Sequence, residues 1–314
     1  AVGAIHTINM YLCLIPLQER IEWLSHYSKH GEMPFMPVEF GVPLHTTFHR
    51  GRAPFHTAVK SEPLATEFCA RRQGAEAYRG ETATYRRDIA RKHEKGQIYD
   101  NWQGHPFIFM DNTQRLIADY VRETWRHWRT WGITGGMIPW NRGHGWKRTE
   151  HAGERVELPN FDPGRRGCWY PSMARADLQA FGTPAFAPTP AGEAMMRNNA
   201  PTLAWIAGGE HADVDPKAGF CDRTHHYLSG QAVQKQIVLI NDRRQPADFQ
   251  LRARLDMAER NHSSAVHEET VRVAPASEVF VSVKWQLPDD VETASNAVIR
   301  LSCQVADADN QEML

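Results

Sequence analysis

Glu39 is the carboxylate whose setting in this chain most strongly suggests chemistry. It lies in the short apolar run PFMPVEF at residues 34–40, immediately before Gly41. A charged side chain in such a run needs a partner, because burying an unpaired charge is costly. Glu39 is therefore either a carboxylate held in a catalytic site or a surface or salt-bridged residue near a strand end. We take Glu39 as the candidate catalytic residue.

Asn9 and Tyr11 are candidate partners of that carboxylate. They lie two residues apart in an apolar stretch, and residues two apart in a strand share a face. Both can donate hydrogen bonds to a carboxylate, which favours its ionised form. The alternative for Tyr11 is a core residue with a satisfied hydroxyl.

His45 and Trp140 complete the set of candidate substrate-binding residues. His45 follows Glu39 in a polar loop, where the alternative is a solvated side chain. Trp140 ends the short apolar segment 133–140, which is predicted to be a strand, and its flat ring would suit the apolar face of a ligand. The segment follows a predicted helix at residues 112–131, whose apolar side chains recur at three- and four-residue steps.

The elements around Glu39 are predicted to be a strand, a helix and a second strand. Residues 4–15 form an apolar, partly β-branched run that ends at Pro16. Residues 17–30 place apolar side chains at helical spacing before Gly31, and residues 34–40 have the length of a strand. This order is typical of a parallel sheet, in which ligands bind beyond the carboxyl ends of the strands.

A change of periodicity divides the chain into three parts. Residues 1–150 hold the strand and helix units, with a long partly helical insertion after Glu39. Residues 151–198 are rich in Gly, Pro and Arg and are predicted to be an irregular linker. Residues 199–314 alternate with a period of two, which is typical of a β-sandwich. The strands expected in the last part cover residues 202–206, 233–240, 247–255, 268–273, 279–285 and 297–305.

Charge and composition exclude several classes of partner. The 36 Lys and Arg residues balance 37 Asp and Glu residues, so we expect no nucleic-acid partner and no anionic membrane surface. No apolar run approaches the roughly 20 residues of a membrane helix.

Five scattered cysteines and 16 histidines show no complete metal-ligand spacing. We expect no metal and no other cofactor, and the sequence does not define the oligomeric state.

The pieces TINMYL, PFMPVEFG and WGITGGMIPWN, in this order, resemble the C-terminal part of a glycoside hydrolase of family 2. The resemblance implies the last strands and helices of a (β/α)8 (TIM) barrel, followed by an immunoglobulin-like β-sandwich. It also implies a carbohydrate substrate, hydrolysis of β-glycosidic bonds with retention, and Glu39 as the nucleophile. Asn9, Tyr11 and Trp140 match residues that line the sugar pocket in that family. A periplasmic or secreted location is favoured by the resemblance alone.

The chain also departs from that family. A complete barrel takes about 250 residues, which the first 150 cannot supply, and no Asn-Glu dipeptide is present to match the family's acid/base. We therefore expect a C-terminal portion of a longer enzyme that supplies the nucleophile only. The alternatives are a non-catalytic carbohydrate-binding or structural module and, ranked last, a metal-dependent hydrolase that uses its histidines.

Overall fold

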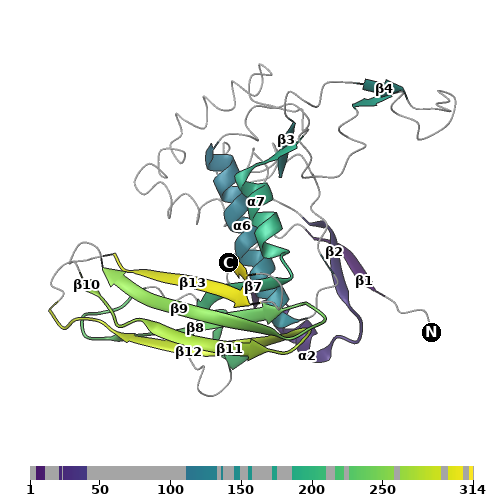
Figure 1. Ribbon diagram of the computed structural model, residues 1–314. Coiled ribbons are helices and arrows are strands. Elements are labelled where there is room, and N and C mark those ends of the chain that lie inside the picture. Colours follow the sequence, from purple (N-terminus) through teal and green to yellow (C-terminus); the bar gives the residue numbers. More distant parts are fainter. Residues whose placement is uncertain are drawn as a thin grey trace, which may run out of the picture.

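The described part of the chain is mostly antiparallel sheet, with two longer helices packed against it (Figure 1). The computed structural model describes residues 5–10, 21–22, 24–40, 111–132, 136, 145–148, 155–157, 172–174, 186–209, 216–222, 226–257, 262–290, 296–306 and 311–313.

The N-terminal unit is a strand, a helix and a strand. β1 (His6–Met10) pairs in parallel with β2 (Phe35–Phe40), and α2 (Ser25–His30) lies between them in sequence. The ring of Phe35 contacts those of His6 and Tyr27, at centroid distances of 5.4 and 5.3 Å. These aromatic contacts hold the helix against the strand pair. The predicted parallel arrangement of this unit is confirmed.

Two antiparallel sheets form the C-terminal part. The first has three strands in the order β12 (Ser277–Gln286), β8 (Ala232–Asn241), β7 (Thr202–Gly208). The second has five strands: β10 (His262–Ser263), β9 (Ala247–Met257), β11 (His267–Val273), β13 (Val298–Ala306) and β14 (Gln311–Met313). Each of the six strands expected in this part overlaps an observed strand.

Alternating side chains build the core between the two sheets. In β9, Phe249, Leu251 and Leu255 are buried, while Gln250 and Arg252 between them are exposed. Strand geometry sends successive side chains to opposite faces, so one face of β9 packs inward and the other meets water. The period-two pattern in the sequence is therefore the pattern of burial.

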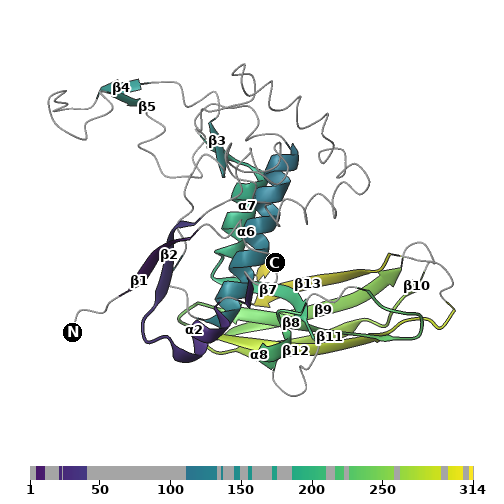
Figure 2. The same cartoon turned by 180° about the vertical axis from the view of Figure 1, so that it is seen from behind.

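Strand β8 is covered on both faces. Ile237 and Leu239 belong to the core between the sheets, whereas Val238 and Ile240 belong to a second core that includes helix side chains. A strand that is buried on both faces has a nearly continuous run of apolar residues in its sequence. The three-stranded sheet is thus the middle layer, between the five-stranded sheet and the helices (Figure 2).

The helices of the second core are α6 (Asp111–Trp131) and α7 (Pro190–Asn198). The predicted helix at residues 112–131 is confirmed, and it ends at Gly132, whose φ of 71° is the left-handed conformation that commonly closes a helix. Thr189 caps α7, because its hydroxyl accepts a 3.2 Å hydrogen bond from the Gly192 amide. None of the described helices is both long and apolar enough to cross a bilayer.

The remaining elements are short. They are α8 (Pro216–Gly219) and the antiparallel pairs β3 (Trp146–Arg148) with β6 (Phe186–Pro188) and β4 (Arg155–Glu157) with β5 (Ser172–Ala174).

The predicted partial TIM barrel is wrong, and with it the fold that the family 2 resemblance implied. In the part of the chain that the structure describes, β1 and β2 are the only parallel pair, and all other pairings are antiparallel. Strands and helices alternate again from β6 to β8, but the described pairings of these strands are antiparallel, unlike those of a barrel. The reason is physical: a short apolar segment fits many sheets, and one strand–helix–strand unit is common to many folds.

Candidate functional site

The carboxyl ends of β1 and β2 form the first candidate site. The register pairs Asn9 with Val38 and Met10 with Phe40, which leaves Glu39 as the extra residue of a bulge. Neighbouring strands lie about 4.8 Å apart, so the backbones of Asn9 and Glu39 are neighbours at one edge of the pair. Bulges re-aim side chains and occur often beside active sites.

The structure tests the predicted site residues only in part. It places the backbones of Asn9 and Glu39 close together, while their side chains lie outside what it describes. Tyr11, His45 and Trp140 lie outside the described residues altogether. The two strands thus position one predicted carboxylate and one predicted amide, and the roles of the other three residues stay predictions.

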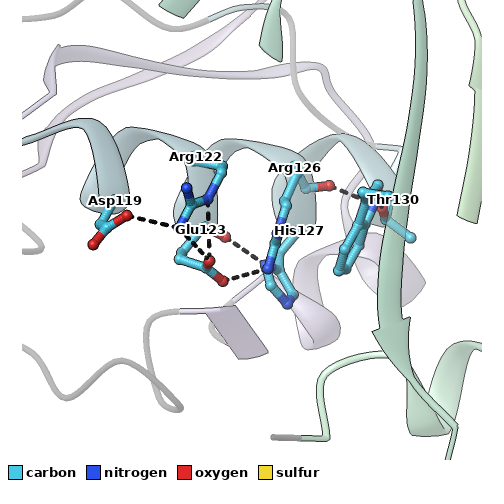
Figure 3. Close-up of polar contacts among 7 residues, drawn as sticks. Asp119, Arg122, Glu123, Arg126, His127 and Thr130 are labelled. Carbon is cyan, nitrogen blue, oxygen red and sulfur yellow. Dashed lines mark hydrogen bonds and ion pairs between the residues drawn. The ribbon is translucent and has the colours of Figure 1, made fainter. Parts of the chain in front are cut away.

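A buried polar row on α6 is the second candidate, shown in Figure 3. Glu123 is 4% exposed and forms an ion pair of 2.5 Å with Arg126 and another of 3.3 Å with Arg122. Arg122 also lies 2.7 Å from Asp119. Two guanidinium groups therefore balance two carboxylates on one side of the helix.

His127 continues this row toward the three-stranded sheet. It is 2% exposed, its Nδ1 donates to the backbone oxygen of Glu123, and its ring centroid lies 4.6 Å from that of Trp205. Thr130 donates to the Arg126 carbonyl at 2.8 Å and accepts from the Trp205 indole at 3.2 Å. These bonds connect α6 to β7 through polar groups.

The chemistry of this row suits a structural role better than a catalytic one. Its carboxylates are neutralised by arginines, and a buried charge is tolerated only when it has a partner of opposite charge. Among the described residues, no group of three His, Cys, Asp or Glu side chains could hold a metal ion. The row was not predicted from the sequence. The four-residue spacing of Asp119, Glu123 and His127 could have indicated it, because this spacing places all three on one helix face.

Two hollows lie elsewhere in the described part. One, of about 570 Å³, lies on the outer face of the five-stranded sheet over β9, β11 and β13. The other, of about 420 Å³, lies where α2, the end of α6 and α8 meet. Both have volumes typical of small-ligand sites.

Two titratable groups of the sheets have shifted pKa values. Burial raises the pKa of the Cys303 thiol to about 12, so the thiol stays protonated and inert at neutral pH. The hydroxyl of Ser263 lowers the pKa of Asp256, and Arg300 and Arg254 act in the same direction. Neither group lies at the β1–β2 edge, so neither shift bears on that candidate site.

Comparison with known proteins identifies no family. No protein-family profile and no curated protein matches the sequence. Among solved structures, a protein from Archaeoglobus fulgidus is 10% identical with a TM-score of 0.23, and the match covers 36% of this chain and 86% of that one. Spo0M, a sporulation control protein from Bacillus subtilis, is 12% identical with a TM-score of 0.18, over 36% of this chain and 45% of that one.

A third structure is the alkylpurine DNA glycosylase AlkC of Pseudomonas fluorescens, bound to DNA that contains an abasic site analogue. It is 10% identical with a TM-score of 0.23, and the match covers 81% of this chain and 55% of AlkC. At such TM-scores these likenesses carry no argument about fold or function. The functional assignment therefore rests on the residues of this chain.

Proposed function

We propose that this protein hydrolyses β-glycosidic bonds in oligo- or polysaccharides with retention of configuration, and that Glu39 is the nucleophile. The observation that carries the proposal is the position of Glu39 at a bulge, beside Asn9, at the carboxyl edge of a parallel strand pair. Ligands of parallel sheets bind at that edge. This role for Glu39 requires only the pair of strands β1 and β2, and it does not require a TIM barrel.

Retaining hydrolysis defines what Glu39 would do. Its carboxylate oxygen would attack the anomeric carbon and form a glycosyl ester, while a second carboxyl group roughly 5 to 5.5 Å away protonates the leaving oxygen. Water would then cleave the ester and release the sugar. The Asn9 amide is of the right type to donate a hydrogen bond to the carboxylate or to a sugar hydroxyl. The proposal assigns no residue to the acid/base role.

Activated substrates test Glu39 without the acid/base. A dinitrophenolate leaves without protonation, so 2,4-dinitrophenyl β-glycosides require only the nucleophile. We expect Glu39→Gln to abolish turnover of these substrates, and azide to restore turnover in Glu39→Ala by forming an α-glycosyl azide. The matched control is Glu32→Gln, because Glu32 is an exposed carboxylate just before β2. Equal turnover by the Glu39 and Glu32 variants would refute the proposal.

A non-catalytic carbohydrate-binding module is the second candidate, and the hollow on the five-stranded sheet favours it. Beside Leu251 and three charged residues, Arg252, Glu268 and Glu269, four uncharged residues with hydrogen-bonding side chains line that hollow: Gln250, Thr270, Ser302 and Gln304. The register places Thr270, Gln250 and Gln304 in one row across three strands. This candidate predicts glycan binding that survives Glu39→Gln and is lost in the double variant Gln250→Ala/Gln304→Ala.

A further inference from the structure

One side of the β-sandwich is an open strand edge. Within the described residues, β11 ends the five-stranded sheet there and pairs only with β9, and β12 ends the three-stranded sheet and pairs only with β8. Figure 1 shows β11 and β12 along the same side of the sandwich. On the opposite side, β14 already covers part of the β13 edge. The β11–β12 side therefore offers two neighbouring edges at which further strands can pair.

Neither strand carries the backbone features that usually prevent edge pairing. β11 has seven residues and β12 has ten, and neither contains a proline. Both pair with their neighbours in a continuous register without a bulge. Proteins that keep an edge unpaired commonly shorten it, bulge it, interrupt it with proline or place charges on it. Only charges are present here, so their arrangement decides what this edge accepts.

The charges of β11 are complementary to themselves about Thr270. Glu268 lies two residues before Thr270, and Arg272 lies two residues after it. If two copies of β11 pair in antiparallel fashion with Thr270 at the centre, each Glu268 lies opposite the Arg272 of the other copy. The three side chains share the outer face of the sheet. The Glu268 and Arg272 side chains are more than 60% exposed, so a second copy can reach them.

The neighbouring strand extends this match into a row of alternating charge. Within one copy, Glu268 lies 3.2 Å from Arg252, and Arg272 lies 3.0 Å from Asp248. Across the pairing, the row would run from Asp248 and Arg272 of one copy to Glu268 and Arg252 of the other. Every charge keeps the partner that it already has, and the two inner charges gain a second neighbour of opposite sign.

β12 has the same symmetry about Val281. Glu278 lies three residues before Val281, and Lys284, which is exposed, lies three residues after it. Thr270 and Val281 lie at nearly equal distances along the chain from the turn that joins β11 to β12. One two-fold axis perpendicular to the sheets can therefore pass near both residues. Lys284 then faces the Glu278 of the other copy, and Glu278 keeps its ion pair with Lys217.

We propose that the β11–β12 edge is the interface of a symmetric homodimer, in which both sheets of the sandwich continue into a second copy of this chain. A two-fold interface requires a patch that is complementary to itself, which the charges of both strands provide. The edge includes no residue of the β1–β2 site, so this proposal is independent of the proposed catalytic function. The dimer also places the uncharged rows of Thr270, Gln250 and Gln304 from the two copies end to end.

Sedimentation velocity of the 314-residue chain tests the interface through charge reversal. We expect the parent chain to form a dimer that dissociates on dilution. Arg272→Glu sets carboxylates against each other across the axis, and Glu268→Arg sets guanidinium groups against each other. Each variant alone should therefore dimerise at least about tenfold more weakly than the parent chain. An equimolar mixture of the two variants should regain the dimer, because every charge in the mixed pair again faces its opposite.

Arg300→Glu is the matched control. Arg300 is an exposed arginine of β13 that also pairs with a carboxylate, Asp256, but it lies away from the β11–β12 edge. This variant should dimerise like the parent chain. A parent chain that stays monomeric up to about 100 µM would overturn the proposal. So would a monomeric mixture of the two edge variants, or equal dimerisation by Arg272→Glu and Arg300→Glu. A circular dichroism spectrum equal to that of the parent chain shows that each variant has folded.

Discussion

Phe35 of β2 lies edge-on to Trp128 of α6, with ring centroids 6.3 Å apart and both side chains completely buried. This contact joins the parallel strand pair to the helix that packs on the three-stranded sheet. The edge that holds Glu39 is therefore supported by a core that extends into the C-terminal part of the chain. A two-stranded sheet is marginal by itself, which makes this support necessary.

Replacing Phe35 tests that support. Phe35→Ala should lower the free energy of unfolding by about 3–5 kcal/mol, because it removes a buried aromatic ring and leaves a cavity beside Trp128. Urea denaturation followed by circular dichroism measures the change. Met33→Ala, at a side chain that is 43% exposed, should change the stability by less than about 0.5 kcal/mol. Similar losses in the two variants would show that Phe35 does not anchor β2.

The ion pairs on α6 predict a contrast between buried and exposed carboxylates. Glu123→Gln should cost about 2–4 kcal/mol of stability, because it removes the buried charge that both Arg126 and Arg122 contact, although Arg122 keeps its ion pair with Asp119. Glu268→Gln also removes a carboxylate from an arginine, Arg252, but both side chains are more than 60% exposed. That pair should be worth at most about 1 kcal/mol. The same urea assay compares them, and equal costs would contradict the burial argument.

The Cys303 thiol predicts alkaline sensitivity. Its folded pKa of about 12 lies above the ordinary value of 9.0. The folded state therefore binds the proton more tightly, and the stability that this provides is complete below pH 9 and is lost as the pH rises toward 12. Cys303→Ala should show a flatter pH dependence of unfolding in this window. A slope equal to that of the parent chain would exclude Cys303 as its cause.

Thiol labelling gives an independent check on the same group. Cys303 and Cys221 are both buried free thiols. Iodoacetamide should therefore modify neither of them in the folded chain at neutral pH, and should modify both after unfolding in urea. Peptide mapping by mass spectrometry locates the labels. Rapid labelling of Cys303 in the folded chain would contradict its burial.

Regular features of the fold were predictable from the sequence, and side-chain relationships were not. The helix at α6 follows from a hydrophobic period of 3.6, and the strands β7, β8, β9, β11, β12 and β13 follow from a period of 2. The parallel order of β1 and β2 follows from the strand, helix and strand pattern. The bulge at Glu39 could not be foreseen, because a one-residue shift in register leaves no mark in the sequence.

The errors have the same origin. The barrel was predicted from short strand-end motifs, which describe a local segment and leave open how many further strands join the sheet. The polar row from Asp119 to Thr130 was overlooked because its members lie beside the predicted apolar face of the helix, and the hydrophobic period does not show that they are buried as well. Only the contacts with Trp205 show how this face accommodates polar groups. The Arg126 guanidinium lies 4.6 Å from the centre of that ring, and the Thr130 hydroxyl accepts a hydrogen bond from the indole N–H.

Covalent trapping tests the role of Glu39 most directly. A 2-deoxy-2-fluoro-β-glycosyl fluoride reacts with the nucleophile of a retaining enzyme and leaves a stable glycosyl ester. We expect a mass increase of one fluorosugar on the peptide that contains Glu39, in the parent chain and in Glu32→Gln, and no increase in Glu39→Gln. A fluorosugar attached to any other carboxylate, or continued labelling of Glu39→Gln, would contradict it.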